Sequence, residues 1–450
     1  MAVAVLQQPF SVVPLAELFY CYILILFVLY VKVLLRKHFI ERKENMDLKK
    51  IIDKKDLAAQ YMVDEITYIC QKFEKRGPGS KGEKQACEYA AKQMKEYGCD
   101  RVYVEPFKEN PDSFYGWIYF TITCCFLALV SYFFVPALSI VFIALGLLLC
   151  VLQFGLYKKV VDKCFKEKTG HNAAGFKKPT GEVKRRIIFN GHPDAAWEWP
   201  FKYMFTYLGF DIHMTLCFLG AFYLLGISIA KLANALDDKL AITLGLVTLV
   251  FVPFWFGLYF MWNKKRVVDG ANDNLSGCYI GMAILKYLKD EGIELENTEI
   301  GVVLTGSEEA GLRGAKAWCE AHADEFNDVP TFVYSYDTIA QSEQLMVNYR
   351  DLNATVKVDK DVSDLFYEAC QDLGIPCKKG FVPPLGGATD SAAFAQAGMR
   401  STGITALNHA LPDFYHTRLD NPDALNKDCL AKCFAASVKV LEMFDDGAKQ

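Results

Sequence analysis

Five short motifs in this sequence carry side chains of the kinds that bind metal ions in proteins. Each motif lies in a polar part of the chain, and several come directly after an apolar run. The motifs are GHPDA with His192 and Asp194, DGANDNLSG with Asp273, GSEEAGLRG with Glu308 and Glu309, YSYDT with Asp337, and FYHTRLDN with His416. Any one of them also fits a solvated loop or a helix cap. Together they supply the ligands of a two-zinc site with a bridging carboxylate and a neighbouring general base.

The pair Glu308 and Glu309 is the motif that is hardest to explain without a cation. Both carboxylates come at the end of the apolar strand predicted in TEIGVVLTGSEEAG. Adjacent carboxylates repel one another, so burying both at a strand end costs free energy. A metal ion offsets that cost, because one carboxylate can bind the ion while the other accepts a proton. Asp194, two residues after His192, is placed to orient the ring of a metal-binding His192.

The combination resembles the co-catalytic di-zinc aminopeptidase family, whose relatives include bacterial leucyl aminopeptidases, glutamate carboxypeptidases and glutaminyl cyclases. RGPGSKGE around Pro78 looks like the family's N-terminal Arg-x-x-Gly-Ser element. ATDSAAFAQAG looks like its Ser/Thr-Asp-His-x-x-Phe segment, but Ser391 stands where many members have His. The resemblance covers most of the polar part of the chain.

The resemblance implies a role for each side chain of the motifs. Of two zinc ions per chain, His192 and Asp337 would hold one, Glu309 and His416 the other, and Asp273 would bridge both. Glu308 would be the general base, and Asp194 would position His192. His409, seven residues before His416, is a candidate for stabilising an oxyanion, although a solvated loop is the simpler interpretation.

The leading hypothesis is a membrane-anchored, zinc-dependent exopeptidase: an aminopeptidase that hydrolyses N-terminal peptide bonds with a two-metal-activated water. A glutaminyl cyclase-like acyltransferase and a catalytically inactive, peptidase-like scaffold or receptor are the alternatives. Metal content separates them, because we expect two zinc ions for the peptidase, one for the cyclase and none for the scaffold. The sequence carries no pattern that indicates an oligomeric state or the residue preferred at the substrate's N-terminus.

The hydrophobic content of the chain indicates membrane-spanning segments. Hydrophobic residues make up 52% of the 450 residues, and the mean hydropathy is +0.13 although 23% of the residues are charged. Five nearly uncharged stretches approach the roughly 20 residues that cross a bilayer. They run over about 18–35, 115–133, 136–157, 212–230 and 240–262. The first predicts an N-terminal anchor, and the other four predict two helical hairpins.

The polar segments that remain alternate between strand and helix patterns, which predicts one α/β domain. As in the zinc exopeptidases that it resembles, we expect a mixed central sheet flanked by helices, with five transmembrane helices inserted as an anchor and two hairpins. The predicted parts are an anchor and basic linker at 1–50, hairpins at 113–157 and 203–262, and a peptidase domain at 51–112, 158–202 and 263–450.

The apolar patterns place most of the motifs at strand ends. Strands are predicted in RVYVEPF, RRIIFNGH, TEIGVVLTGSEEAG and TFVYSYD, and helices in KQACEYAAKQMKEY and GCYIGMAILKYLKD. Three of these strands end in His or acidic side chains. Because ligands bind at the carboxyl ends of the strands in open α/β sheets, these side chains should meet at one edge of the sheet.

Charge and cysteine patterns predict the partners and the location of the protein. The net charge of −4 gives no support for a nucleic-acid partner, so a peptide substrate and the lipid bilayer are the expected partners. Lys and Arg cluster after the first, third and fifth spans, which predicts a cytoplasmic catalytic domain at the cell membrane. Fifteen cysteines without paired spacing agree with a reducing compartment. Trp197 and Trp199 are candidates for aromatic anchors at the membrane surface.

Overall fold

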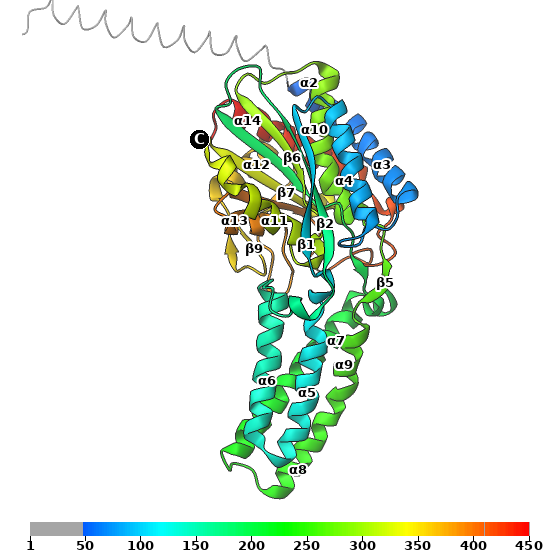
Figure 1. Cartoon of the computed structure of the whole chain (residues 1–450), viewed down its shortest axis with the longest axis vertical. Coiled ribbons are helices and arrows are strands. Elements are labelled where there is room, and N and C mark those ends of the chain that lie inside the picture. The colour runs from blue at the N-terminus through cyan, green and yellow to red at the C-terminus, as the bar shows by residue number, and fades with distance from the viewer. Residues whose placement is uncertain (1–47, 409, 450) are drawn as a thin grey trace, which may run out of the picture. The chain divides into compact units, whose positions relative to one another are not determined.

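Within the residues that the computed structural model describes, 48–408 and 410–449, a mixed eight-stranded sheet forms the centre of an α/β layer (Figure 1). In spatial order its strands are β1 (Arg101–Glu109), β2 (Lys168–Lys177), β6 (Thr298–Leu304), β3 (Arg185–Gly191), β7 (Thr331–Ile339), β12 (Arg400–Ala406), β8 (Leu345–Asn348) and β11 (Lys378–Gly380). The middle strands β6, β3, β7 and β12 run parallel, whereas the β1–β2, β2–β6 and β12–β8 pairs are antiparallel. This arrangement confirms the predicted mixed sheet. The anchor span predicted at 18–35 and His409 lie outside the described residues.

Helices cover both faces of this sheet. They are α2 (Lys49–Asp53), α3 (Lys55–Lys72), α4 (Lys81–Glu96), α10 (Gly277–Glu291), α11 (Arg313–His322), α12 (Lys360–Asp372), α13 (Ser391–Gln396) and α14 (Lys427–Asp445). Helix α10 packs on β3 and β7 and is covered in turn by α3 and α14, whereas α11 packs against α13, β1 and β2. The predicted helix in KQACEYAAKQMKEY corresponds to α4, which begins after Ser80 because this side chain accepts a hydrogen bond from the Glu83 backbone N–H.

The central strands are apolar throughout because both of their faces are buried. Every residue of β6 is buried, and the alternation of side chains sends neighbours in β3 to opposite faces. Phe189 packs against α10, where Gly281 permits the close approach: a Cβ there would lie 2.8 Å from the Phe189 Cβ. Ile188 joins the cluster on the other face, which includes Leu312 and Ala315 of the α11 region. The core therefore holds the carboxyl ends of β3, β6 and β7 in fixed positions.

A bundle of apolar helices is attached to this layer. Among the described residues, four helices are long and apolar enough to cross a membrane: Pro111–Phe134, Pro136–Gly155, Pro200–Leu232 and Asp238–Phe260. They contain α5 (Trp117–Phe134), α6 (Pro136–Cys150), α7 (Pro200–Leu232), α8 (Asp238–Val247) and α9 (Val252–Gly257). Large apolar side chains are exposed on their outer surfaces, and Phe134 is 80% exposed. This surface is compatible with a membrane protein, since water-soluble bundles bury such side chains.

Several polar contacts join the helices of the bundle, including the following two, which are buried. Ser139 of α6 and Ser228 of α7 share a hydrogen bond of 2.9 Å between their hydroxyl oxygens. The Tyr132 hydroxyl of α5 donates to the Ala241 carbonyl of α8 at 2.8 Å. In an apolar surrounding such bonds fix how the helices pack, because an unpaired hydroxyl there would cost free energy.

Both apolar insertions leave and re-enter the α/β layer through paired strand residues. Glu109 at the end of β1 pairs with Lys168 at the start of β2, so the first insertion is the long loop of an antiparallel pair. The second insertion lies between β4 (Trp197–Glu198) and β5 (Asn263–Val267), in which Glu198 pairs with Asn263. A further short pair, β9 (Arg350–Asp351) and β10 (Val356–Lys357), lies outside the central sheet.

Helix α7 begins well before the span predicted at 212–230. Pro200 occupies its first turn, where a missing backbone N–H costs nothing. The Lys202 ammonium is buried and donates to the carbonyl oxygens of Pro412 at 2.5 Å and Tyr415 at 2.8 Å. The helical conformation is interrupted at Thr206, which has φ 59°. The extra turns place the start of α7 beside the loop that carries His416.

Candidate metal centre

The sheet brings the motif side chains to one edge. His192 follows β3 directly, Glu308 and Glu309 lie in the turn after β6, and Asp337 lies near the end of β7. Because β6, β3 and β7 are parallel neighbours, their carboxyl ends converge. Asp273 comes from the segment Ala271–Ser276 before α10, and His416 comes from the loop between β12 and α14.

Two groups of potential ligand atoms share the carboxylate of Asp273. The first group contains His192, Asp273 and Asp337, and the second contains Asp273, Glu309 and His416; within each group all atoms lie within 4.8 Å of one another. The Asp273 Oδ1 lies 3.4 Å from the His192 Nε2, and its Oδ2 lies 3.1 Å from the His416 Nε2. One carboxylate therefore presents one oxygen to each group, which is the arrangement of a bridging ligand.

The electrostatics of this cluster favour bound cations. Burial, together with the nearby Glu309 and Asp337 carboxylates, raises the pKa of Glu308 well above its usual value. Burial and the Asp273 carboxylate raise the pKa of Asp337 to about 8. For His416, the Glu309 and Asp273 carboxylates outweigh the effect of burial and raise the pKa to about 9. So many buried carboxylates in one place retain protons unless positive charge compensates them.

The donor atoms of the cluster fit a metal ion. Among the described residues, the His192 Nε2 and the Glu309 Oε1 are buried and have no hydrogen-bond partner. Imidazole nitrogens and carboxylate oxygens are common ligands of zinc. An unpaired buried polar atom costs free energy, so both atoms are explained by a ligand that the protein residues do not supply.

The Asp194 carboxylate contacts three of the motif residues. Its Oδ1 and Oδ2 accept the backbone N–H groups of Glu308 and Glu309, each at 3.1 Å. The same Oδ1 lies 3.3 Å from the His192 Nδ1. One fully buried carboxylate thus positions a ring and the turn that carries both glutamates, which agrees with the positioning role expected for it.

Asp420 plays a similar part for Asp273, and the sequence analysis did not identify it. Its Oδ1 accepts the Asn272 backbone N–H at 2.8 Å and the Asn272 Nδ2 at 3.0 Å, and its Oδ2 accepts the Asp273 backbone N–H at 3.0 Å. Burial and the Asp273 carboxylate raise the pKa of Asp420 to about 7. The available signal was its position four residues after His416, in the motif FYHTRLDN.

The two elements quoted for the family resemblance lie close behind the cluster. Arg76 of RGPGSKGE donates to the Pro193 carbonyl at 2.7 Å and to the Gly270 carbonyl at 2.9 Å, which ties the GHPDA loop to the DGANDNLSG loop. Ser391, which stands in place of the family's His, is fully buried and donates its hydroxyl to the Asp351 Oδ2 at 2.6 Å.

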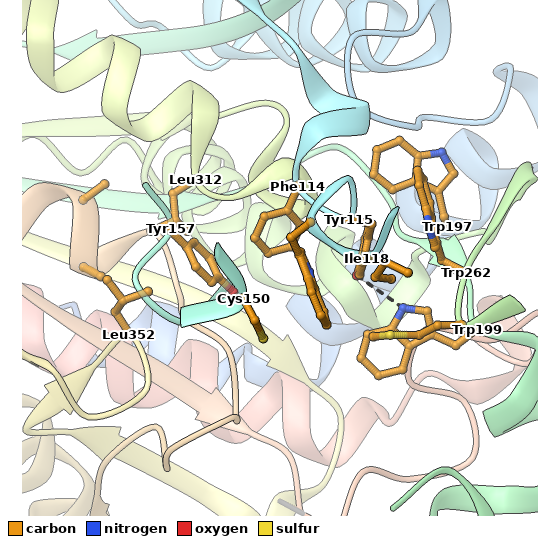
Figure 2. Packing of buried hydrophobic residues seen from close by; sticks show 14 of the residues in the cluster. Phe114, Tyr115, Ile118, Cys150, Tyr157, Trp197, Trp199, Trp262, Leu312 and Leu352 are labelled. Atoms are coloured by element: carbon orange, nitrogen blue, oxygen red, sulfur yellow. Dashed lines mark hydrogen bonds between the residues drawn. The ribbon is translucent and has the colours of Figure 1, made fainter. Parts of the chain in front are cut away.

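Trp197 and Trp199 lie inside the protein and not on a membrane-facing surface, so their prediction as aromatic anchors is wrong. Figure 2 shows both rings among other buried aromatic side chains, with Trp199 beside Tyr115. The Trp199 indole N–H donates to the Tyr115 hydroxyl at 3.3 Å, and its backbone N–H donates to the His416 carbonyl at 2.8 Å. The Trp199 and His416 ring centroids are 4.4 Å apart. Trp197 packs against Trp262, and both tryptophans are buried.

A cavity of about 420 Å³ opens onto the cluster. Its polar end is formed by Asp273, Glu308, Glu309, Asp337 and His416. Its other walls include Tyr157, Trp199, Tyr415, residues 382–389 and apolar side chains of the helical bundle. Such a volume lies within the roughly 300–1,000 Å³ that is common for small-molecule sites.

Residues 259–441 match Peptidase family M28. This part of the chain contains Asp273, Glu308, Glu309, Asp337 and His416, whereas β3 and His192 precede it. The M28 match confirms the resemblance to the co-catalytic zinc peptidases on which the sequence analysis rests. It supports a metallopeptidase in the coarse sense of the family. Comparison with curated proteins gives no match.

Two solved aminopeptidase structures share the fold. The aminopeptidase from Aneurinibacillus sp. strain AM-1 superimposes with a TM-score of 0.51 and 15% identity, covering 86% of this chain and 93% of that chain. BSAP, a zinc aminopeptidase from Bacillus subtilis, gives a TM-score of 0.51 and 14% identity, covering 85% and 94%. A glutaminyl cyclase from Bacteroides thetaiotaomicron gives a TM-score of 0.49 and 14% identity, covering 87% and 97%. At these identities the likeness concerns the fold alone.

Proposed function

We propose that this chain is a membrane-anchored, zinc-dependent aminopeptidase. The observation that carries the proposal is the pair of ligand groups that share Asp273 at the polar end of the cavity. The family match and the fold support a peptidase, and the two groups support two metal ions per chain. The four apolar helices support attachment to a bilayer.

In this proposal the side chains hold the metals as the sequence predicts. His192 and Asp337 would hold one zinc ion, Glu309 and His416 would hold the other, and Asp273 would be shared by both. When bound, the two ions polarise the scissile carbonyl and make water a stronger nucleophile near neutral pH.

Glu308 is the general base. Its side chain lines the cavity but belongs to neither ligand group, and its Oε2 lies 3.8 Å from the His192 Nε2. Positive charge on metal ions held beside it would keep this buried carboxylate deprotonated, so that it can accept a proton. The Glu308 carboxylate accepts the proton of the attacking water and returns it to the nitrogen of the leaving amine.

Metal content and activity test the proposal together. The full-length protein, purified in detergent, is assayed on aminoacyl-coumarin amides with and without a chelator, and its zinc is measured by plasma emission. We expect two zinc ions per chain and chelator-sensitive hydrolysis. One zinc ion with conversion of the glutaminyl-coumarin amide to its pyroglutamyl amide and ammonia would indicate the cyclase, and no zinc with no activity would indicate the scaffold.

Glu308→Gln examines the proton transfer separately. The amide is nearly isosteric but cannot accept the proton, so turnover should fall roughly 10²- to 10⁴-fold at unchanged zinc content. Glu320→Gln, at an exposed position in α11, is the matched control and should keep wild-type turnover. Equal turnover of Glu308→Gln and wild type at matched zinc content would remove Glu308 from the mechanism.

We further propose that the catalytic domain lies on the cytoplasmic side of the cell membrane. The support is the clustering of Lys and Arg after three of the predicted spans. The described cysteines agree, since they are free and most are buried. The proposed substrate is a peptide, and its chemistry is examined next.

A further inference from the structure

The cavity has a second end, formed by the apolar bundle. Besides the carboxylates, its lining includes Phe114, Phe154, Phe210, Met214, Phe218 and Met261. With the exception of Met261, these side chains belong to three of the helices that are long and apolar enough to cross a membrane, and Met261 directly follows the fourth. The wall that faces the metal ligands is therefore made of the segments that distinguish this chain from a compact α/β domain.

Helix α7 contributes a continuous stripe to that wall. Phe210, Met214 and Phe218 are spaced four residues apart, so they lie on one face of the helix and all three line the cavity. Ile212 and Leu219 lie on another face, and each is 51% exposed. One face of α7 thus borders the cavity, and another carries the apolar surface expected to contact lipid.

Apolar side chains continue from the cavity to the outer surface. Leu385 lines the cavity and is 69% exposed, and the neighbouring Phe381 is 49% exposed. At the start of α7, Phe205 and Leu208 are 55% and 57% exposed. Asp211 and Thr215 are the polar side chains of α7 among the described lining residues, and both are exposed. An amphiphile held at the bilayer surface meets apolar side chains both outside the cavity and within it.

We infer that the substrate is an amphiphile that carries a long apolar chain on the residue whose peptide bond is cleaved. The inference rests on the proposed aminopeptidase activity and specifies its substrate class. The amide lies at the carboxylates, and the chain lies between the membrane-spanning segments, in the end of the cavity lined by Met214 and Phe218. A short side chain would leave this apolar wall in contact with water, which is unfavourable in proportion to the area left uncovered.

Graded substrates test the inference. The coumarin amides of alanine, norleucine, 2-aminooctanoic acid and 2-aminododecanoic acid differ in the length of one linear side chain. Because transferring a methylene from water to an apolar site is favourable, kcat/KM should rise about fourfold per added methylene until the cavity is filled. Values of kcat/KM that are flat, or that fall with chain length, would overturn the inference while the aminopeptidase activity stands.

Binding is measured separately, so that the inference does not depend on turnover. The free 2-amino acids of the same series are the products, and calorimetry gives their Kd for the wild-type protein in detergent. The Kd should fall by a similar factor per methylene. Chain-dependent binding without any hydrolysis would sustain the apolar binding end and refute the aminopeptidase. Binding independent of chain length would refute the apolar binding end.

Paired substitutions in α7 locate the chain. Thr215→Trp places a large ring at the cavity wall and should reduce the advantage of the 2-aminododecanoyl over the alanyl substrate at least tenfold. Leu219→Trp, one turn further along the same row of α7 but outside the cavity lining, is the matched control and should keep the wild-type ratio. Equal ratios in both variants would show that the chain does not lie along α7.

Discussion

The substitution Asp420→Asn tests whether the hydrogen bonds to Asp420 support zinc binding. Its carboxylate accepts three hydrogen bonds from two consecutive residues, Asn272 and the bridging Asp273. In Asp420→Asn the remaining amide oxygen can keep both bonds from Asn272. The new amide nitrogen then faces the Asp273 backbone N–H, and this donor loses its partner in a buried environment.

The size of the effect follows from that single lost bond. An unsatisfied buried donor costs about 1–3 kcal/mol. If the cost falls on the metal-bound arrangement, zinc affinity decreases roughly 5- to 150-fold, since about 1.4 kcal/mol corresponds to a factor of ten. This range agrees with the 10- to 100-fold losses typical of residues that position metal ligands.

Competition with a chromogenic chelator at pH 7 measures the zinc affinity of the purified variant. Asp423→Asn is the matched control, because it removes the same charge three residues away, where the side chain is exposed. We expect wild-type affinity for the control and a clear loss for Asp420→Asn. A variant that unfolds at a lower temperature but binds zinc as tightly as the wild type would refute the reasoning, since Asp420 would then support only the loop.

Three further predictions address the metals, the charges and the orientation. Asp273→Ala should remove nearly all zinc after dialysis, as plasma emission would show, because one carboxylate serves both ions; retention of two zinc ions would disprove the bridge. Burial lowers the pKa of Lys316 to about 7, so the unfolded chain binds an extra proton between about pH 7 and 10.5. The wild type should therefore gain thermal stability relative to Lys316→Met from pH 7 to pH 9, and a constant difference in unfolding temperature would contradict this. An impermeant maleimide should label the exposed Cys164 only after cell lysis, with Cys164→Ser as the background; labelling on intact cells would reverse the orientation.

The sequence predicts that the candidate ligand residues lie close together, because the same apolar strands give the local pattern and the tertiary placement. An apolar run that ends in His192 or in Glu308 must form a buried strand, and parallel strands bring their carboxyl ends together. Asp420 is different, since nothing in a loop sequence distinguishes a carboxylate that accepts backbone N–H groups from one that is solvated. The surroundings predicted for Trp199 were wrong for a related reason, because an aromatic ring next to an apolar helix fits lipid and protein surroundings equally well. The last two strands of the sheet, β8 and β11, have only four and three residues, which is too short to give a periodic pattern, so the strand order beyond β12 has no local signal.

The paired ends of the two apolar insertions bear on how the sheet accommodates them. Glu109 is paired with Lys168, and Glu198 with Asn263, so the α/β layer already closes both gaps without the helices. Lengthening a loop whose ends are fixed costs little, about 0.6 kcal/mol for each doubling of its length. The strand pairing therefore depends little on the length of the segment inserted between these residues. Both hairpins can be accommodated as loop extensions, with the strands and their pairing unchanged.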